Sequence, residues 1–355
     1  YYLSTSGSDT NNGTSPATAW ATFSQADSVA VSGDTVRALN GTYYLGTPGQ
    51  TSDCIHTYSS GVTWTSDTKW GAKIVCQAAR GANAAIWVIA GDNETVMNFD
   101  LSSNSTQNLG LIVYSFSSNP LKGNNTLIKG NKVHDMPHDG SCTDFGDGIS
   151  VQTEGLSGVV IDANVVFNIG PWSSTSCSAK FGITSKGNAV ISNNIVYHSS
   201  GGGIELHCCQ GGAVATNNTL FNNTRAGIVV DTTSGNTIQN NIIYNNGTIA
   251  TKTCGIDDYN VPSPGTTISN NLLYGNQPAN YCVTDVAGST PAGQALADPQ
   301  FVNYQGDGSG DYHLTSTSAA IDSGTSTNGP AFDYDGVPRP QGSHWDIGAF
   351  EFVPR

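Results

Sequence analysis

A seven-residue block recurs through the middle of the chain, and this repeat narrows the folds open to the sequence. The clearest copy is ISNNIVY, and copies begin at residues 128, 161, 191, 215, 238 and 268, the first being the weakest match. A second motif, Gly-Ile, lies between successive copies, at 148–149, 182–183, 203–204, 227–228 and 255–256. Two interleaved β-motifs that recur about every 20 to 35 residues, without helical periodicity, predict a solenoid of stacked β-coils.

An Asn occupies the same place in every copy of the block. These residues are Asn131, Asn164, Asn194, Asn218, Asn241 and Asn271. An Asn at one turn of stacked coils can bond the Asn and the backbone above and below it, so we expect an internal ladder of amides. The blades of a β-propeller need about 40 residues and four strands each. The shorter repeat therefore favours an all-β parallel β-helix over a propeller or a sandwich.

Composition agrees with this fold and limits the partners. Charged residues make up 11% of the chain and Gly 42 of 355 residues, which disfavours surface helices and favours short strands joined by tight turns. The formal charge of −14 argues against nucleic acid and anionic membranes as partners. No stretch approaches the roughly 18 continuous apolar residues of a membrane span. The first residues lack the charged and apolar regions of a signal peptide, so we expect a mature, processed chain.

The cysteines indicate disulfides and a secreted, extracellular protein. The chain has eight cysteines and no paired CxxC motifs of a structural zinc site, which favours an oxidising compartment. We expect Cys54 to pair with Cys76, and Cys142 with Cys177. The connectivity of the remaining four stays open: Cys208, Cys209, Cys254 and Cys282.

The two ends of the chain differ from the repeat. We expect one domain and a monomer, with an N-terminal cap and first coil at 1–50, coils at 51–296 and a C-terminal cap at 297–355. A helix is expected within ATFSQADSVA at 21–30. Both end segments and the Asn column resemble those of secreted right-handed parallel β-helix proteins of the pectate-lyase-like superfamily. This resemblance covers most of the chain and implies the right-handed fold, which hosts lyases, hydrolases, epimerases, esterases and non-enzymatic binders.

Charged residues gather around the Gly-Ile strands of three successive coils. If the Ile side chains point into the core, the residues one and three positions further on face outward, on coils about 4.8 Å apart. Lys186, His207 and Asp231 would then form one row. The charged residues expected on this face are Lys180, Lys186, Glu205, His207, Arg225 and Asp231. A solvated face with weak ion pairs is the alternative, but most other outward positions hold Ser, Thr, Asn or Gly, which favours a functional groove.

The segments that carry this charged row show a second resemblance to a known family. GITSKGN at 182–188, followed by SGGGIEL at 200–206, resembles family-nine pectate lyases, in which a Gly-Phe-Ala-x-Lys strand precedes Ser-Asp-Asp-Gly-Trp-Asp-Leu by one coil. The resemblance gives Lys186 the place of the strand lysine and Glu205 that of the last acidic residue of the calcium motif. The paired aspartates of that motif correspond here to Gly201 and Gly202, so the chain departs from the family pattern at its calcium site.

Uronate β-elimination explains why such residues would be gathered. A base must remove the proton α to the C5 carboxylate, and cations or a metal must hold the charge that develops. Lys186 is the predicted base, with His207 as its competitor or as the acid, while Arg225 and Lys180 would neutralise the substrate. The expected function is that of a polysaccharide lyase acting on an acidic, uronate-containing polysaccharide.

Two other function classes stay open. An inverting glycoside hydrolase needs two separated carboxyl groups, which Glu205 could form with Asp231, or with Asp257 at about 9.6 Å by the strand spacing. A carbohydrate-binding β-helix without turnover would use Trp172 and Tyr259 as stacking platforms.

An acidic loop is the remaining candidate. PHDGSCTDFGDG at 137–148 contains Asp139, Asp144 and Asp147, whose oxygens suit Ca²⁺. Asx turns explain the same residues equally well. Calcium is thus the cofactor that the sequence suggests, and no organic cofactor is expected.

Overall fold

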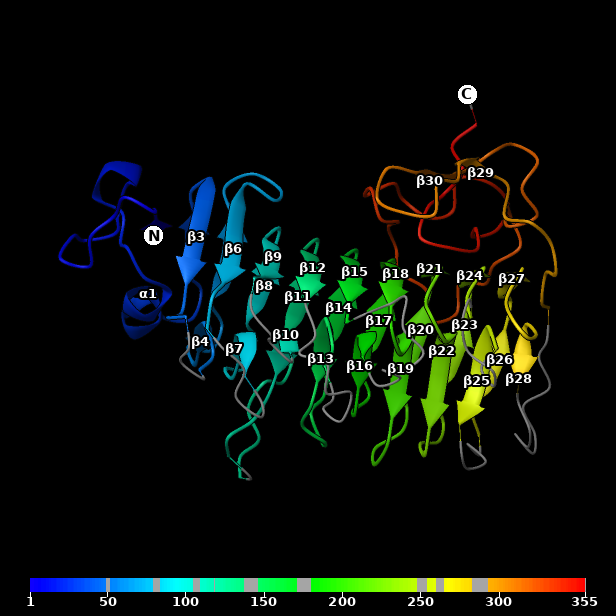
Figure 1. The fold of residues 1–355 in the computed structure, drawn as a ribbon, viewed down its shortest axis with the longest axis horizontal. Coiled ribbons are helices and arrows are strands. Elements are labelled where there is room, and N and C mark those ends of the chain that lie inside the picture. Colours follow the sequence, from blue (N-terminus) through cyan, green and yellow to red (C-terminus); the bar gives the residue numbers. More distant parts are fainter. Residues whose placement is uncertain are drawn as a thin grey trace.

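The chain folds into stacked coils that form a right-handed parallel β-helix, in which each complete coil contributes one strand to each of three sheets (Figure 1). The computed structural model describes residues 1–48, 52–78, 84–104, 109–117, 119–136, 146–170, 180–247, 254–259, 265–282 and 293–354.

Within these residues the three sheets are parallel throughout. The first sheet contains β1 (Tyr2–Leu3), β2 (Thr35–Ala38), β5 (Thr63–Ser66), β8 (Thr95–Met97), β11 (Leu127–Lys129), β14 (Val160–Asp162), β17 (Val190–Ser192), β20 (Val214–Thr216), β23 (Thr237–Gln239) and β26 (Thr267–Ser269). The second sheet contains β3 (Gly41–Leu45), β6 (Ala72–Cys76), β9 (Asp100–Ser103), β12 (Lys132–Met136), β15 (Val165–Ile169), β18 (Ile195–Ser199), β21 (Thr219–Phe221), β24 (Ile242–Tyr244) and β27 (Leu272–Tyr274). The third sheet contains β4 (Ile55–Thr57), β7 (Ala85–Ile89), β10 (Leu109–Val113), β13 (Ile149–Val151), β16 (Phe181–Ser185), β19 (Gly202–His207), β22 (Ala226–Asp231), β25 (Ile256–Tyr259) and β28 (Tyr281–Cys282).

The Gly-Ile motifs lie in register in the third sheet. Their isoleucines pair from coil to coil, and each is fully buried in the main core: Ile149, Ile183, Ile204, Ile228 and Ile256. The prediction that this column points inward is confirmed. The residues that follow each isoleucine therefore lie on the outer face of the third sheet, because side chains alternate along a strand.

The predicted Asn ladder is present between the first and second sheets. Each of the first five amides donates from Nδ2 to Oδ1 of the next Asn at 2.9–3.2 Å, and all six side chains are fully buried: Asn131, Asn164, Asn194, Asn218, Asn241 and Asn271. The ladder ends at Gln294, whose Oε1 accepts the backbone N–H of Asn271 at 3.1 Å. Each amide also bonds the backbone, so the buried polar groups at this turn are satisfied.

The first Asn of each Asn-Asn pair has a separate role. Asn193, Asn217, Asn240 and Asn270 have φ between 52° and 55°. Asn adopts this left-handed conformation more readily than most residues with a side chain. The chain therefore turns from the first sheet to the second at this residue, and the following Asn enters the ladder.

The N-terminal segment covers one end of the coils (Figure 1). It contains the short 3₁₀ helix η1 (Pro16–Thr18) and α1 (Phe23–Val29), which confirms the expected helix. Thr22 caps α1 by accepting the Gln25 backbone N–H at 3.1 Å. Phe23 packs edge-on against the buried Trp87, with ring centroids 5.2 Å apart. The helix thus closes the apolar interior at the first coils.

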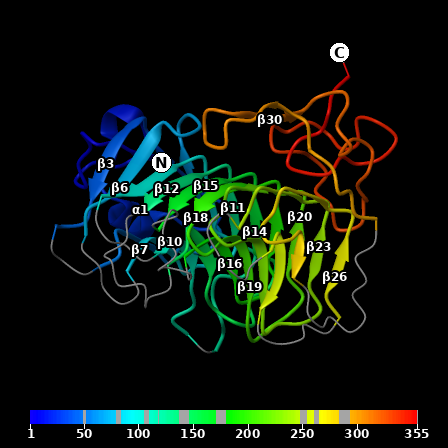
Figure 2. The ribbon, with the colours of Figure 1, turned by 45° about the vertical axis from the view of Figure 1, so that its right-hand side comes forward.

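The C-terminal segment lies along the side of the coils rather than across their end, where a cap was expected. Figures 1 and 2 show this segment, in orange and red, beside the second sheet, with the antiparallel pair β29 (Phe301–Asn303) and β30 (Asp311–Leu314). The aromatic residues that end the repeat blocks explain this position. Phe167, Tyr197 and Phe221 stack at 4.9–5.0 Å on the outer face of the second sheet, and Tyr312 stacks on Phe221 at 4.3 Å.

Three disulfides join described cysteines. The predicted Cys54–Cys76 pair is confirmed, and the pairs left open are Cys208–Cys209 and Cys254–Cys282. Cys142 and Cys177 lie outside the described residues. Among the helices of the described segments, none has the length and apolarity needed to cross a membrane.

Candidate functional site

The charged row lies on the outer face of the third sheet, where β16, β19 and β22 are neighbours. His207 pairs with Asp231 in the strand register, and Ser185 pairs with Leu206. Lys186 follows Ser185 directly, so it lies beside His207. The core isoleucines occupy the opposite face of the same strands. The register therefore brings Lys186, His207 and Asp231 together as the sequence predicts.

His207 is held between two carboxylates. Its Nδ1 lies 3.5 Å from Glu205 Oε1 and 3.3 Å from Asp231 Oδ2. The hydrogen bond to Glu205 is the main cause that raises the pKa of His207 above its ordinary value, while partial burial and the charge of Lys186 oppose this shift. The two carboxylates therefore make the imidazolium form more favourable here than in a free histidine. The side chain is 19% exposed, so solutes reach it.

A buried carboxyl group lies behind the row. Asp147 is 2% exposed, and its Oδ2 accepts hydrogen bonds from Ser150 Oγ at 3.1 Å and Gln152 Nε2 at 3.2 Å. Burial, followed by the nearby charge of Glu205, raises the pKa of Asp147 to about 7. Thr184 Oγ1 donates to Glu205 Oε2 at 3.4 Å and helps to fix that carboxylate. Asp147 is thus buried behind the site and is not an exposed cation ligand.

Lys180 differs from its expected place. It is only 5% exposed, because the strand alternation is interrupted at Gly182. A Cβ added at Gly182 would lie 2.2 Å from Val196 Cγ1, so this glycine faces the core, as does the isoleucine that follows it. The column of outward residues does not continue to the residue two positions before the glycine. Lys180 is therefore a buried residue rather than the outward substrate contact that we expected, while Arg225 at the equivalent position is half-buried.

The carboxylates have the wrong spacing or access for the inverting hydrolase. One oxygen each of Glu205 and Asp231 lie within 4.8 Å of one another and share His207, whereas an inverting pair is separated by about 6.5–9.5 Å. Asp257 lies two strands from Glu205, with Val229 between them in the register. Glu205 and Asp257 are only 6% and 5% exposed, which leaves little room for a sugar between them.

The remaining predicted residues lie outside what the structure describes. Trp172, Asp139 and Asp144 belong to segments that are not described, and the side chain of Tyr259 is not described although its backbone pairs with Asp231.

The same cluster has the donor set of a metal site. One ligand atom each of Glu205, His207 and Asp231 lie within 4.8 Å of one another. One imidazole nitrogen with two carboxylate oxygens suits a transition metal better than calcium, which takes six to eight oxygens. The family-nine calcium motif does not fit here. A Cβ at Gly201 would lie 2.8 Å from the Lys180 backbone nitrogen, so an aspartate at Gly201 requires the backbone to move.

Exposed aromatic residues extend the face toward the N-terminal coils, and the sequence analysis missed them. Tyr58 and Tyr114 are 58% and 37% exposed, and Phe116 is 61% exposed. Backbone hydrogen bonds continue the pairing of the third sheet past the strand ends, at Ala90, Tyr114, Gln152 and Lys186, and Ala90 N–H donates to Thr57 O, the residue before Tyr58. Tyr58 and Tyr114 therefore lie in the same outward column as Lys186. Tyr114 contacts Phe116 edge-on at 4.8 Å. The early coils lack the Gly-Ile motif, so the repeat did not locate these residues.

Comparison with known proteins places this geometry in a fold family. A family model described as right handed beta helix region matches residues 121–294. No curated protein has significant sequence similarity to the chain. The solved structure of pectate lyase Pel9A superposes with a TM-score of 0.63 at 16% identity, over 99% of this chain and 96% of that one.

Two further solved structures are more distant. The A-module of the mannuronan C-5 epimerase AlgE4 from Azotobacter vinelandii has a TM-score of 0.48 at 15% identity, over 74% of this chain and 86% of that one. A rhamnogalacturonan lyase has a TM-score of 0.46 at 13% identity, over 85% and 90%. Identities this low compare folds and not active-site residues. The repeat, the Asn ladder, the family model and the Pel9A superposition agree on the fold: the chain is a right-handed parallel β-helix.

Proposed function

We propose that this protein is a polysaccharide lyase that cleaves a uronate-containing polysaccharide by β-elimination on the outer face of the third sheet. The observation that carries the proposal is the Lys186 side chain beside an imidazole whose charged form the carboxylates of Glu205 and Asp231 favour. An amine next to an imidazolium supplies a base and an acid on one face. The fold shared with pectate lyase Pel9A supports the reaction class.

The residues divide the reaction as follows. The amine of Lys186 removes the C5 proton α to the uronate carboxylate. The electron pair forms the C4–C5 double bond as the C4–O4 bond breaks, and the leaving oxygen takes the proton of His207. Before this transfer, the imidazolium stabilises the negative charge that develops on the carboxylate. Glu205 and Asp231 orient the ring and keep it charged. One proton is gained by Lys186 and one is lost by His207, so the step balances.

The groove has the surface that a sugar chain needs. Tyr58, Tyr114 and Phe116 offer exposed rings in and beside the column of Lys186, and sugar rings pack their C–H faces on such rings. A polymer lying across the strands would thus rest on the aromatic residues while one uronate unit reaches Lys186. We also propose an extracellular location, since the disulfides form in oxidising compartments.

A substrate screen tests the reaction class directly. Polygalacturonate, alginate and glucuronan are incubated with the protein, and ultraviolet absorbance of the unsaturated uronate is followed together with new reducing ends. We expect both signals to rise in parallel on one of these polymers. Reducing ends without absorbance would establish a hydrolase, and binding with neither signal would leave a carbohydrate-binding protein. Activity that a chelator abolishes and one divalent cation restores would show that the reaction needs a metal ion; Glu205, His207 and Asp231 are the candidate ligands, and a metal bound there would exclude the imidazolium of His207 as the acid.

The pH dependence tests the role of His207. The imidazolium is populated below its raised pKa, so the rate falls as the pH rises through that value. Glu205→Gln removes the largest cause of the shift, and we expect the alkaline limb of kcat/KM to move to lower pH. Glu154→Gln, at an exposed position outside the cluster, is the matched control and leaves the limb in place. An unchanged or upward-shifted limb in Glu205→Gln excludes His207 as the acid.

A further inference from the structure

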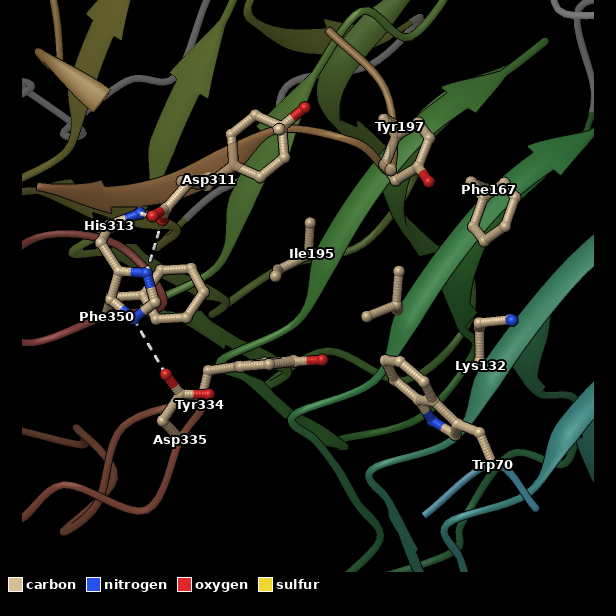
Figure 3. Close-up of a pocket in the computed structure, with 14 residues that line it drawn as sticks. Trp70, Lys132, Phe167, Ile195, Tyr197, Asp311, His313, Tyr334, Asp335 and Phe350 are labelled. Atoms are coloured by element: carbon tan, nitrogen blue, oxygen red, sulfur yellow. Dashed lines mark hydrogen bonds and ion pairs between the residues drawn. The ribbon is translucent and has the colours of Figure 1, made fainter. Parts of the chain in front are cut away.

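A cavity of about 430 Å³ lies on the outer face of the second sheet, under the C-terminal segment (Figure 3). Its floor is made by neighbouring strands of the repeat, with Val165 and Phe167 from β15 and Ile195 and Tyr197 from β18. Pockets for small ligands span about 300–1,000 Å³ and are mostly apolar with a few polar groups. The cavity has this size and is separate from the row on the third sheet.

Aromatic rings from distant parts of the chain surround the cavity. Tyr334 and Phe350 come from the C-terminal segment and Trp70 from the turn between β5 and β6, so Figure 3 shows rings on several sides of Ile195. Trp70 and Tyr334 are half-buried, so their rings meet solvent in the cavity. A ligand between them would contact flat apolar surfaces on more than one side.

Trp70 is held in an unusual conformation. Its φ is 65°, a left-handed value that bulky residues rarely adopt. Its backbone N–H donates to Asn98 O at 2.6 Å, and its indole Nε1–H donates to Gly130 O at 2.8 Å. Both donors are therefore used, and the indole ring, which lies 4.9 Å from Lys69 Nζ and 5.4 Å from Lys132 Nζ, offers the cavity a flat aromatic surface. Such conformations persist where the surrounding structure imposes them, and they concentrate at ligand sites.

The charges at the cavity are paired with one another. His313 lies between Asp311 at 2.7 Å from Nδ1 and Asp335 at 2.9 Å from Nε2, as the dashed lines in Figure 3 mark. Lys132 Nζ lies 2.6 Å from Asp100 Oδ2. Burial lowers the pKa of His313, but the hydrogen bonds to the two aspartates outweigh it and raise the pKa. Asp311 and Asp335 remain nearly half exposed and have a second oxygen each that can accept a hydroxyl group.

We propose that this cavity is a second carbohydrate site, which binds a neutral mono- or disaccharide unit without turnover. The C–H faces of a neutral pyranose pack on Trp70 and Tyr334, and its hydroxyl groups donate to Asp311 and Asp335. A uronate is disfavoured, because Lys132 and His313 already have carboxylate partners and its own carboxylate would face Asp311 and Asp335. The remaining cation, Lys69, lies with Nζ 4.9 Å from the ring centroid of Trp70 and 4.6 Å from that of Tyr334, so its charge is placed against the rings. The charge preference is thus opposite to that of the row on the third sheet. The proposal does not depend on the lyase reaction.

Binding of defined disaccharides tests the site. Cellobiose, mannobiose, xylobiose and β-1,4-galactobiose are titrated into the whole protein by calorimetry or NMR, with digalacturonate as the anionic comparison. We expect at least one neutral disaccharide to bind and Trp70→Gly to weaken that binding about tenfold, the loss of one aromatic contact. Glycine adopts the φ of 65° freely, so this variant removes the ring without adding backbone strain. Tyr44→Ala, which removes a 64% exposed ring elsewhere on the second sheet, is the control and leaves binding unchanged.

A second variant guards against a general disturbance at Trp70. Asp335→Asn keeps the shape of the side chain but removes one hydroxyl acceptor and one partner of His313, and we expect it to weaken the same disaccharide. The proposal is overturned when no neutral disaccharide binds, when binding survives both substitutions, or when digalacturonate is the ligand that Trp70→Gly loses. Because these titrations need no turnover, a protein that fails as a lyase can still pass them.

Discussion

Lys186→Ala lowers the initial rate of uronate elimination by about 10²- to 10⁴-fold, the contribution of a positioned general base. The amine is lost while the imidazolium of His207 and its two carboxylates stay in place. The fold is expected to be unaffected, because Lys186 is half-buried on the outer face and makes no part of the apolar core. Initial rates by ultraviolet absorbance, together with thermal unfolding, measure the two effects separately.

The matched control is Lys73→Ala. Lys73 is an exposed lysine in β6 of the second sheet, so its loss changes the net charge equally and leaves the rate unchanged. Small primary amines added to Lys186→Ala should restore part of the rate, since they supply the missing base. A fully active Lys186→Ala variant would remove Lys186 as the base, and a loss confined to His207→Gln would transfer that role to His207.

The row was predictable because parallel coils pair in register. Once the Asn column and the Gly-Ile column are aligned, residues at a fixed offset from each isoleucine share one face. Counting the same number of residues from each isoleucine predicts that His207 lies opposite Asp231, and the observed strand pairing agrees. It fails at Lys180, since Gly182 faces the core and interrupts the alternation on which the offset depends. Sequence offsets are thus reliable within a strand and not across the bend that begins it.

The structure contains a second buried ladder of Asn side chains, which the sequence analysis did not identify. Asn223, Asn246 and Asn276 bond one another through their amides at 2.9–3.1 Å. Each follows a ladder Asn of the first kind by five residues, but only three coils carry it, and the preceding coil has Ser199 in its place. The constant spacing of five residues was the signal in the sequence that could have predicted this second ladder. With only three copies in an Asn-rich chain, the spacing could not be told from chance.

The cavity on the second sheet was not predictable from the repeat. Trp70, Lys132 and Tyr334 come from a turn, a coil and the C-terminal segment, which have no common period. Their meeting depends on the C-terminal segment folding back over the aromatic ends of the repeat blocks. That return path is set by tertiary contacts between residues more than a hundred positions apart, such as Asn193 Nδ2 with Phe332 O at 2.9 Å.

Arg339 fastens this segment to the coils, and its replacement is expected to have the largest effect on stability. Arg339 Nη1 lies 2.6 Å from Glu351 Oε1 with both side chains fully enclosed, and Nη2 donates to Asn193 Oδ1 on the coils at 3.1 Å. Arg339→Met leaves a buried carboxylate without its cation, which costs about 3–5 kcal/mol. Adding Glu351→Gln should recover part of this loss, since the uncompensated charge disappears. The free energy of unfolding from urea titrations measures both variants.

The exposed pair Arg37–Asp67 is the control for Arg339. Its atoms lie 3.4 Å apart with side chains 42% and 39% exposed, so Arg37→Met should cost less than about 1 kcal/mol.

The part of the chain that loses stability in Arg339→Met matters more than the size of the loss. Because Arg339 joins the C-terminal segment to the turn between the first and second sheets, hydrogen exchange should rise across 296–354 before it rises in the coils. Arg339→Met would then lose disaccharide binding under the segment while uronate elimination on the third sheet continues. Simultaneous loss of both activities would mean that the segment supports the whole solenoid and that the two sites are not independent.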